Sequence, residues 1–240
     1  MISDLRVLGV CPARGGSKGI PRKNLKVIGG ESLVSRVGRL AAQVPEIDRV
    51  VVSTDDDEIA AAAVQAGLAA PFRRTPALGG DQVADHPVLE HALHEMERID
   101  GVRYDVVVML QPTSPLRRPE HVSECVKMLV NGGWDSVWTV SETDSKSHPL
   151  KQFTIVGRRL DYYDPAGKAI IARQQLTPVY HRNGIAYAIT RQCLVEQGSI
   201  MGARSGALVL EGNFVSIDTE WDCDLVELIM ARDRNPAISA

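Results

Sequence analysis

The sequence predicts a three-layer α/β domain in which helices cover both faces of a mostly parallel sheet. Strand and helix patterns alternate over the first 140 residues, as expected when helices connect parallel strands. Two strands are apolar on successive residues, Val50–Val52 and Val106–Val108, which is typical of strands buried on both faces. A basic, glycine-rich loop directly follows the first strand. A length of 240 residues suits one domain, so we assign residues 1–240 to a single unit.

The predicted elements follow one another in regular order. Strands are expected at Val7–Cys11, Arg49–Ser53, Ala69–Phe72, Asp105–Leu110 and Ser136–Val140. Helices are expected at Leu33–Val44, Asp57–Ala66, Pro87–Ile99 and Pro119–Leu129. Right-handed crossovers then bring these strands into one sheet. Regular structure resumes with a strand at Ile185–Ile189 and a last helix near Glu220–Arg232.

The stretch 142–183 interrupts this alternation. It carries several charges, the prolines Pro149, Pro165 and Pro178, and weak strand signals such as Gln152–Val156. Proline removes a backbone donor and interrupts regular structure. We therefore expect an inserted hairpin or arm.

Bulk properties exclude several classes of protein. The net charge of −3 makes the basic loop a local feature, so no nucleic-acid-binding face is expected. No stretch resembles a transmembrane span or a secretory signal, so no membrane partner is expected. The four cysteines, Cys11, Cys125, Cys193 and Cys223, have neither zinc nor redox spacing. Reduced thiols of this kind suit a cytoplasmic protein.

The loop Ala13–Asn24 says most about function. It holds four cations, three glycines and no acid. Glycine lets the backbone approach a ligand, backbone N–H groups can surround an anion, and Lys and Arg neutralise its charge. The loop thus indicates a triphosphate site, although a solvated basic connection is the alternative. It has neither the P-loop spacing nor G-x-G-x-x-G, which argues against a standard NTPase or dinucleotide dehydrogenase.

Two other polar segments lie at the ends of predicted elements. Leu110–Pro119 is a stiff loop in which Gln111 and Arg117 can meet a ligand or merely join two elements. Arg173–Gln175 and His181–Gly184 lie at the end of the irregular stretch. On their own, these last residues read as solvated surface groups.

Acidic and histidine clusters leave open a metal or a structural interpretation. Asp218 precedes the last helix, where a carboxylate can cap the helix or hold Mg²⁺ on phosphate oxygens, and alone the cap is the better interpretation. The run Thr54–Glu58 is better explained as a cap and first-turn acids of a helix. His91 and His94 share a helical face, but no acidic or cysteine ligand completes a zinc site.

Taken together, these segments resemble the acylneuraminate cytidylyltransferases (CMP-sialic acid synthetases), including legionaminate and pseudaminate types. The resemblance covers Val7 to Leu228 and rests on six motifs in matching order. They are Ala13-Arg14-x-x-Ser17-Lys18-Gly19 with Lys23-Asn24, Ser53-Thr54-Asp55, Leu110-Gln111-Pro112-Thr113-Ser114-Pro115-Leu116-Arg117, Arg173-Gln174-Gln175, Asn183-Gly184 and Ile217-Asp218-Thr219-Glu220. The resemblance implies a Rossmann-like nucleotidyltransferase fold. It also implies a reaction in which the anomeric hydroxyl of a nine-carbon 3-deoxy-2-ulosonic acid attacks the α-phosphorus of CTP, releasing pyrophosphate and giving a CMP-sugar.

The resemblance also implies roles for single residues. The nucleotide-binding residues would be Ala13, Arg14, Lys18, Lys23, Asn24, Arg74 and Gln111, with Asn24 and Arg74 reading cytosine. The sugar-binding residues would be Gln111, Lys151, Arg173 and Tyr187. The catalytic residues would be Arg14, Lys23 and Asp218, of which the two cations offset charge that develops toward pyrophosphate. Asp218 would be the ligand of Mg²⁺.

Relatives act as homodimers in which an arm from one subunit completes the site of the other. The stretch 142–183 is the natural arm, so that Lys151 and Arg173 would serve the neighbouring site. Two positions depart from the family pattern. Ser216 stands where many relatives carry a second aspartate, and Asp85 stands where a serine that touches the nucleotide is often found.

Two alternatives stay open from the sequence. A Kdo-type synthetase would use an eight-carbon ulosonic acid, whereas the Arg173–Gln175 and Asn183–Gly184 motifs favour nine carbons. A non-catalytic nucleotide-sugar-binding protein with a decayed metal site is supported only by Ser216.

Overall fold

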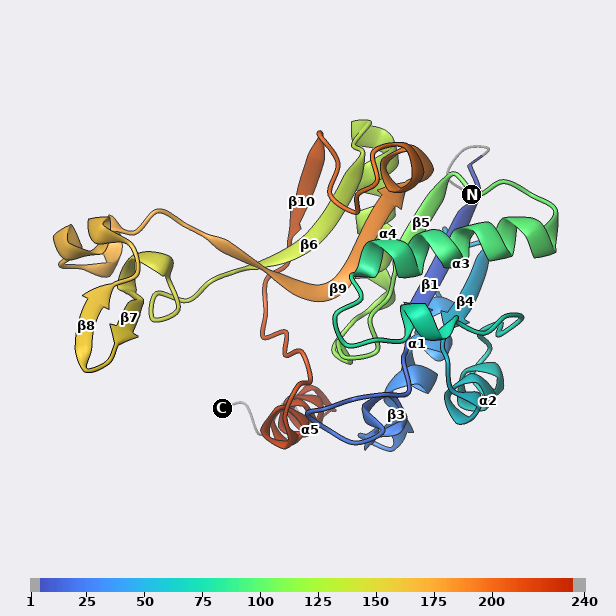
Figure 1. Ribbon diagram of the computed structural model, residues 1–240, viewed down its shortest axis with the longest axis horizontal. Coiled ribbons are helices and arrows are strands. Elements are labelled where there is room, and N and C mark those ends of the chain that lie inside the picture. Colours follow the sequence, from blue (N-terminus) through green and yellow to red (C-terminus); the bar gives the residue numbers. More distant parts are fainter. Residues whose placement is uncertain (1–4, 235–240) are drawn as a thin grey trace.

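A six-stranded, mostly parallel sheet forms the centre of the molecule, as predicted (Figure 1). The computed structural model describes residues 5–234. The sheet has the order β10-β6-β9-β5-β1-β4. Its strands are β1 (Val7–Pro12), β4 (Arg49–Ser53), β5 (Val106–Met109), β6 (Ser136–Glu142), β9 (Tyr180–Thr190) and β10 (Ser205–Val209). Strand β9 runs antiparallel to both of its neighbours, and the other pairs in the sheet are parallel.

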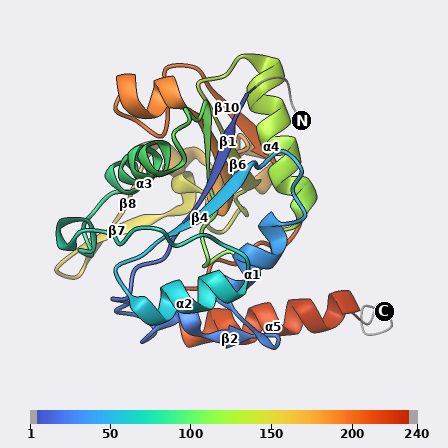
Figure 2. The ribbon, with the colours of Figure 1, turned by 90° about the vertical axis from the view of Figure 1, so that its right-hand side faces the viewer.

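Helices cover the two faces of the sheet, which gives the three expected layers (Figure 2). The helices are α1 (Leu33–Ala41), α2 (Asp57–Gln65), α3 (Asp85–Asp100), α4 (Pro119–Gly132) and α5 (Glu220–Arg234). Helices α1, α2 and α4 bury their apolar sides on one face, together with Val7 and Cys11 of β1. Helix α3 packs on the other face against Leu8 and Val10. Alternate residues of one strand therefore face opposite layers.

A third apolar cluster ties the basic loop to the last helix. Ile20 of that loop is buried with Ile28, Ile217, Cys223 and Val226. Ile28 belongs to the small hairpin of β2 (Val27–Ile28) and β3 (Glu31–Ser32). This packing brings the basic loop and the hairpin against α5, and it places Asp218 next to the basic loop.

The predicted strand at Ala69–Phe72 was wrong. Only Ala69 pairs there, in an isolated parallel bridge with Val51. Pro71 has no N–H to extend the ladder, and the chain instead turns so that the backbone N–H of Arg74 donates to Thr54 O at 2.8 Å. Sequence reasoning also missed β10 and the π-helical turn Gln192–Glu196, which covers the α3 face of the sheet.

The stretch 142–183 stands away from the α/β body, joined to it by the ends of β6 and β9 (Figure 1). It contains the antiparallel hairpin of β7 (Phe153–Val156) and β8 (Arg159–Tyr162), with short 3-10 turns around it. The hairpin exposes apolar side chains, for example those of Ile155 and Val156. Across the described residues, no helix combines the length and apolar character that a membrane span requires.

Candidate active site

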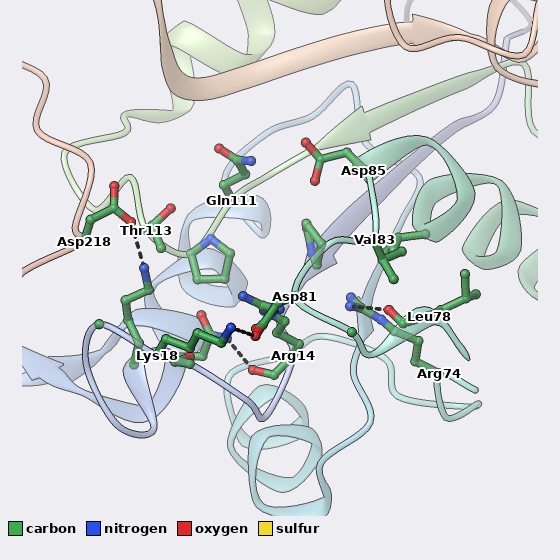
Figure 3. Close-up of a pocket in the computed structure, with 18 residues that line it drawn as sticks. Arg14, Lys18, Arg74, Leu78, Asp81, Val83, Asp85, Gln111, Thr113 and Asp218 are labelled. Carbon is green, nitrogen blue, oxygen red and sulfur yellow. Dashed lines mark hydrogen bonds and ion pairs between the residues drawn. The ribbon is translucent and has the colours of Figure 1, made fainter. Parts of the chain in front are cut away.

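A cavity of about 510 Å³ opens at the carboxyl ends of β1 and β5 (Figure 3). Its wall is built from the basic loop, the segment that leads into α3, the loop after β5 and Asp218. Carboxyl ends of parallel strands are where open α/β sheets bind ligands. The fold therefore gathers the three segments that the sequence singled out into one hollow.

Lys23 joins the basic loop to the segment before α5. Its ammonium group donates to Oδ1 of Asp218 at 2.9 Å and to the backbone oxygen of Ile217 at 2.8 Å, across 195 positions of sequence. A Cβ on Gly19 would lie 2.5 Å from the backbone oxygen of Asp218, so only glycine fits this approach. The side chain of Lys23 is largely buried, whereas 76% of the Asp218 side chain is exposed and open to a ligand.

Arg14 and Lys18 share one carboxylate, that of Asp81. Each cation lies 2.6 Å from a different oxygen of that group. The hydrogen bond from Lys18 and the charges of both cations hold the pKa of Asp81 below its usual range. A triphosphate entering the cavity would therefore compete with one carboxylate for a partly exposed and a largely exposed cation, which is a weak obstacle because solvent screens such pairs.

Asn24 and Ala13 shape the loop from within. The Asn24 amide donates to the backbone oxygen of Arg14 at 2.9 Å, and its side chain is buried at the cavity wall. Ala13 is fully buried, does not line the cavity, and donates its N–H to Ser53 O at 3.0 Å. Both residues fix the path of the loop, and Asn24 also faces the space where a ligand would lie.

Arg74 is a buried cation in the wall of the cavity. Its Nη2 donates to Ser53 O at 2.7 Å, its Nε to Ser53 Oγ at 3.2 Å and its Nη1 to Leu78 O at 3.4 Å. Burial lowers the pKa of Arg74 from its ordinary value. These backbone and hydroxyl acceptors hold the guanidinium in place without neutralising it with a carboxylate.

Arg117 holds the loop after β5 in a fixed conformation. Arg117 is buried and donates to the backbone oxygens of Gln111 at 2.7 Å, Gly184 at 3.1 Å and Ile185. Burial lowers the pKa of Arg117 to about 10. Arg117 thus has the structural role of the two alternatives for this loop, whereas Gln111 lines the cavity.

The Asn183–Gly184 motif has a structural explanation. The Oδ1 atom of Asn183 accepts from Thr139 Oγ1 at 2.7 Å and from the N–H of Ile185 at 3.1 Å, deep in the sheet. Gly184 has φ of +72°, and a Cβ there would lie 2.3 Å from Ser114 Oγ. The motif therefore bends β9 tightly against the loop after β5.

The predicted sugar contacts do not all meet at the cavity. The Tyr187 hydroxyl accepts from the N–H of Gly184 at 3.0 Å, and its ring packs on Trp138 with centroids 4.7 Å apart. Lys151 and Arg173 lie on the protruding stretch, where Arg173 lines a separate hollow of about 550 Å³. Among the four predicted sugar-binding residues, Gln111 is the one that lines the main cavity. The assignment of Lys151 and Arg173 to a neighbouring site stays a prediction.

The acidic run after β4 supports the site without entering it. Asp56 caps α2 by accepting from the N–H of Ile59 at 2.9 Å, which confirms the cap interpretation. Asp56 also pairs with Arg22 at 2.6 Å, and Asp55 accepts from the N–H of Gly15 at 2.8 Å. Two neighbouring carboxylates thus anchor the basic loop.

The donor set of the cavity fits Mg²⁺ bound together with phosphates. Asp218 offers one exposed carboxylate, and no group of three or more His, Cys, Asp or Glu residues forms a metal site within residues 5–234. Mg²⁺ commonly takes one or two carboxylates, substrate phosphates and several waters rather than an all-protein cage. Asp218 would meet this requirement as a single carboxylate, without a second one at Ser216.

Comparison with known proteins identifies the family. The family model described as Cytidylyltransferase matches residues 8–211. The chain belongs to this family. A CMP-N,N'-diacetyllegionaminic acid synthase from Legionella pneumophila is 32% identical over 230 residues, covering 94% of this chain and 97% of the relative. A pseudaminic acid cytidylyltransferase from Campylobacter jejuni is 29% identical over 227 residues, covering 94% and 96%.

Solved structures agree on the fold of this cytidylyltransferase. A CMP:2-keto-3-deoxy-manno-octonic acid synthetase complexed with CTP superposes with a TM-score of 0.69 at 22% sequence identity, covering 95% of this chain and 99% of that one. The predicted family and fold class are thereby confirmed, and the chain is a nucleotidyltransferase enzyme.

Proposed function

We propose that this enzyme transfers CMP from CTP to the anomeric hydroxyl of a nine-carbon, sialic-type ulosonic acid. The observation that carries the proposal is the convergence of Arg14, Lys18, Lys23 and Asp218 on one cavity. It occurs in a chain whose curated relatives include enzymes named for legionaminic, pseudaminic and neuraminic acids.

The reaction needs positioning and charge neutralisation more than covalent participation by the protein. The anomeric oxygen forms a bond to the α-phosphorus of CTP, the bond from that phosphorus to the bridging oxygen breaks, and pyrophosphate carries away the electron pair. The hydroxyl proton passes to solvent water as the bond forms. Arg14, Lys18 and Lys23 hold the triphosphate, and their charges offset the negative charge that grows on the leaving pyrophosphate.

Asp218 would hold Mg²⁺ in this cavity. When bound, the ion supplies Lewis-acid charge to the phosphate oxygens. Lys23 orients the Asp218 carboxylate through the 2.9 Å ion pair, so that loss of either residue disturbs the other. Asn24 and Arg74 face the base, and Gln111 faces the acceptor sugar.

We further infer that the enzyme assembles as a homodimer and works in the cytoplasm. The exposed apolar hairpin of β7 and β8 suits a homodimer in which each protruding stretch brings Lys151 and Arg173 to the cavity of its partner. A cation suits the acceptor's carboxylate. The four buried free cysteines suit the reducing cytoplasm.

Pyrophosphate release from CTP and Mg²⁺, measured with a panel of acidic sugars, tests the proposal. Sialic, legionaminic and pseudaminic acids are expected to give release, with the eight-carbon Kdo as the comparison. Faster release with Kdo would replace the nine-carbon assignment by the alternative that the superposed structure represents. Tight CTP binding without release for any sugar would mean a nucleotide-binding protein instead of an enzyme.

A further inference from the structure

Asp85 is a cavity residue that the proposed reaction leaves without a role. It is the first residue of α3 and lines the main cavity. Unlike those of Asp81 and Asp218, its carboxylate has no hydrogen bond or ion pair with any described residue, although the charges of Arg182 and Arg74 act on it. Burial raises the pKa of its carboxyl above the ordinary value. A partly desolvated carboxylate without a partner is costly unless a ligand supplies the donors.

The surroundings of Asp85 differ from the phosphate end of the cavity. Figure 3 shows Lys18 and Asp218 on one side, and Asp85 with Val83, Leu78 and Arg74 on the other. Val88, from the first turn of α3, adds a further apolar wall. Apolar walls with a few fixed polar groups are typical of sites for flat, partly polar rings. This end of the cavity therefore suits a nucleobase better than a phosphate or a carboxylate.

Two charges of opposite sign act on each other across this end. The carboxylate of Asp85 and the guanidinium of Arg74 lie close enough for each to shift the pKa of the other. Arg74 is held by Ser53 and Leu78, so its position is fixed before a ligand arrives. The pair presents one acceptor and one donor on neighbouring parts of the wall.

This arrangement of one acceptor and one donor complements the hydrogen-bonding groups of cytosine and not those of uracil. Cytosine carries an amino group at C4, which donates, and acceptors at N3 and O2. Uracil has an acceptor at O4 and a donor at N3. A carboxylate facing C4 accepts from the cytosine amino group and repels the uracil oxygen. Sites that leave such groups unpaired discriminate strongly against the wrong ligand.

We propose that Asp85 accepts a hydrogen bond from the amino group of cytosine while Arg74 donates to its ring acceptors. This inference rests on the proposed function, because it takes the nucleotide to be CTP. Relatives often carry a serine that touches the nucleotide at this position, and the inference gives the aspartate of this chain a direct part in selecting the base. Asn24 faces the same cavity and remains compatible with a second contact.

The position of Asp85 at the start of a helix does not explain why its carboxylate lies in the cavity without a partner. Asp57 is the first residue of α2 and gains the same benefit from the helix dipole. It is nevertheless exposed, lies outside the cavity and pairs with Arg73 at 2.9 Å. Asp57→Asn is therefore a matched control, because it removes one charge from the same helical position without touching the cavity.

Equilibrium binding of CTP, UTP and 2′-deoxy-CTP, with Mg²⁺ and without sugar, tests the inference. The wild-type protein is expected to prefer CTP over UTP. Asp85→Asn and Asp85→Ala should lower this preference roughly ten- to a hundredfold, while Asp57→Asn leaves it unchanged. An Asn side chain offers both a donor and an acceptor, so it no longer selects between the two bases. Thermal unfolding of each variant establishes that it is folded.

The other outcomes distinguish failure of the inference from failure of the proposed function. If folded Asp85 variants bind CTP but keep the full preference over UTP, the inference is overturned and the proposed function stands. If they keep that preference but lose discrimination against 2′-deoxy-CTP, Asp85 contacts the ribose and the inference is again wrong. If the wild-type protein binds no CTP, the proposed function itself fails, together with the inference.

Discussion

At the scale of single residues, the cavity holds nearly balanced charges. Its wall carries four cations, Arg14, Lys18, Lys23 and Arg74, and three carboxylates, Asp81, Asp85 and Asp218. The surplus of one positive charge is smaller than the negative charge of a triphosphate. A metal ion that binds with the nucleotide would supply the missing charge, which is why we expect Mg²⁺ to be required for tight CTP binding.

Replacing Lys23 by Ala is expected to weaken CTP binding about ten- to a hundredfold, because one charge-assisted contact is worth about 1.5–3 kcal/mol. Titration of CTP in the presence of Mg²⁺ measures the effect. Lys26→Ala is the control, since Lys26 is ion-paired with Glu220 at 2.5 Å and does not line the cavity. A loss below twofold for Lys23→Ala would contradict the triphosphate site.

The base preference should depend on pH through Asp85. Burial raises the pKa of Asp85, while Arg74 and Arg182 of β9 oppose part of that rise. The ionised form is the acceptor, so the preference for CTP over UTP is present above the folded pKa of Asp85. It should be lost as pH falls through that pKa, at a higher pH than an ordinary aspartate would give.

The same shift affects the stability of the protein without nucleotide. A carboxyl whose pKa is raised by folding stabilises the folded state only while it is protonated, so this stabilisation is lost as pH rises through the folded pKa. Asp85→Asn should flatten both pH profiles, which binding titrations and thermal unfolding can measure. An unchanged CTP-over-UTP profile in that variant would assign the titration to another group.

At the scale of elements, local sequence patterns predicted where strands and helices lie. They did not predict how strands far apart in the sequence pair. The bounds of β4 and the start of α1 agree with the predictions because apolar runs and capping residues are local signals. The antiparallel direction of β9 could not be read from its sequence, since a buried strand is apolar whichever way it runs. Strand β10, with partly exposed residues, carried too weak a pattern.

The site residues that come soon after the ends of predicted strands could be predicted from the sequence. Arg14, Lys18, Lys23 and Gln111 all line the cavity as the sequence indicated. Arg117 could not be assigned from sequence, because two of its three partners are backbone oxygens of β9, 67 and 68 positions away. Asp85 stood out only as a departure from the family pattern, and its lack of a partner became visible only in three dimensions.

The close approach of the basic loop to the segment before α5 can be tested by substituting Gly19. Gly19→Ala would place a Cβ 2.5 Å from the backbone oxygen of Asp218, so the two segments must separate. Gly16→Ala in the same loop meets nothing within 4 Å and is the control. We expect Gly19→Ala to reduce turnover roughly ten- to a hundredfold, since misplaced reacting groups lose rate steeply, and Gly16→Ala to have little effect. Equal turnover of the two variants would show that the separation is not critical.

At the scale of the whole molecule, the protruding stretch is the feature that the α/β body does not explain. Its hairpin exposes Phe153, Ile155 and Val156, although apolar surface of this kind normally becomes covered. Lys151 and Arg173 lie on this stretch and do not line the cavity of their own subunit. A homodimer with exchanged arms accounts for both observations, because the arm is then covered and its cations reach a second cavity.

Mixing two defective subunits tests this arrangement. Lys23→Ala damages the body half of a site, and Arg173→Ala removes a cation from the arm half. In a mixed dimer with exchanged arms, one site contains both defects and the other contains none. Random reassembly of equal amounts should therefore restore about a quarter of the wild-type turnover, measured as pyrophosphate release at limiting sugar.

A mixture of two body variants provides the control for this recovery. Lys23→Ala and Asp218→Ala both alter the same half of the site, so each cavity in their mixed dimer keeps one defect and turnover should stay low. Differently tagged subunits show whether mixed dimers have formed. Mixed dimers of Lys23→Ala and Arg173→Ala that recover no activity would place the arm's cations outside the neighbouring site. The acceptor's carboxylate would then need a cation of its own subunit.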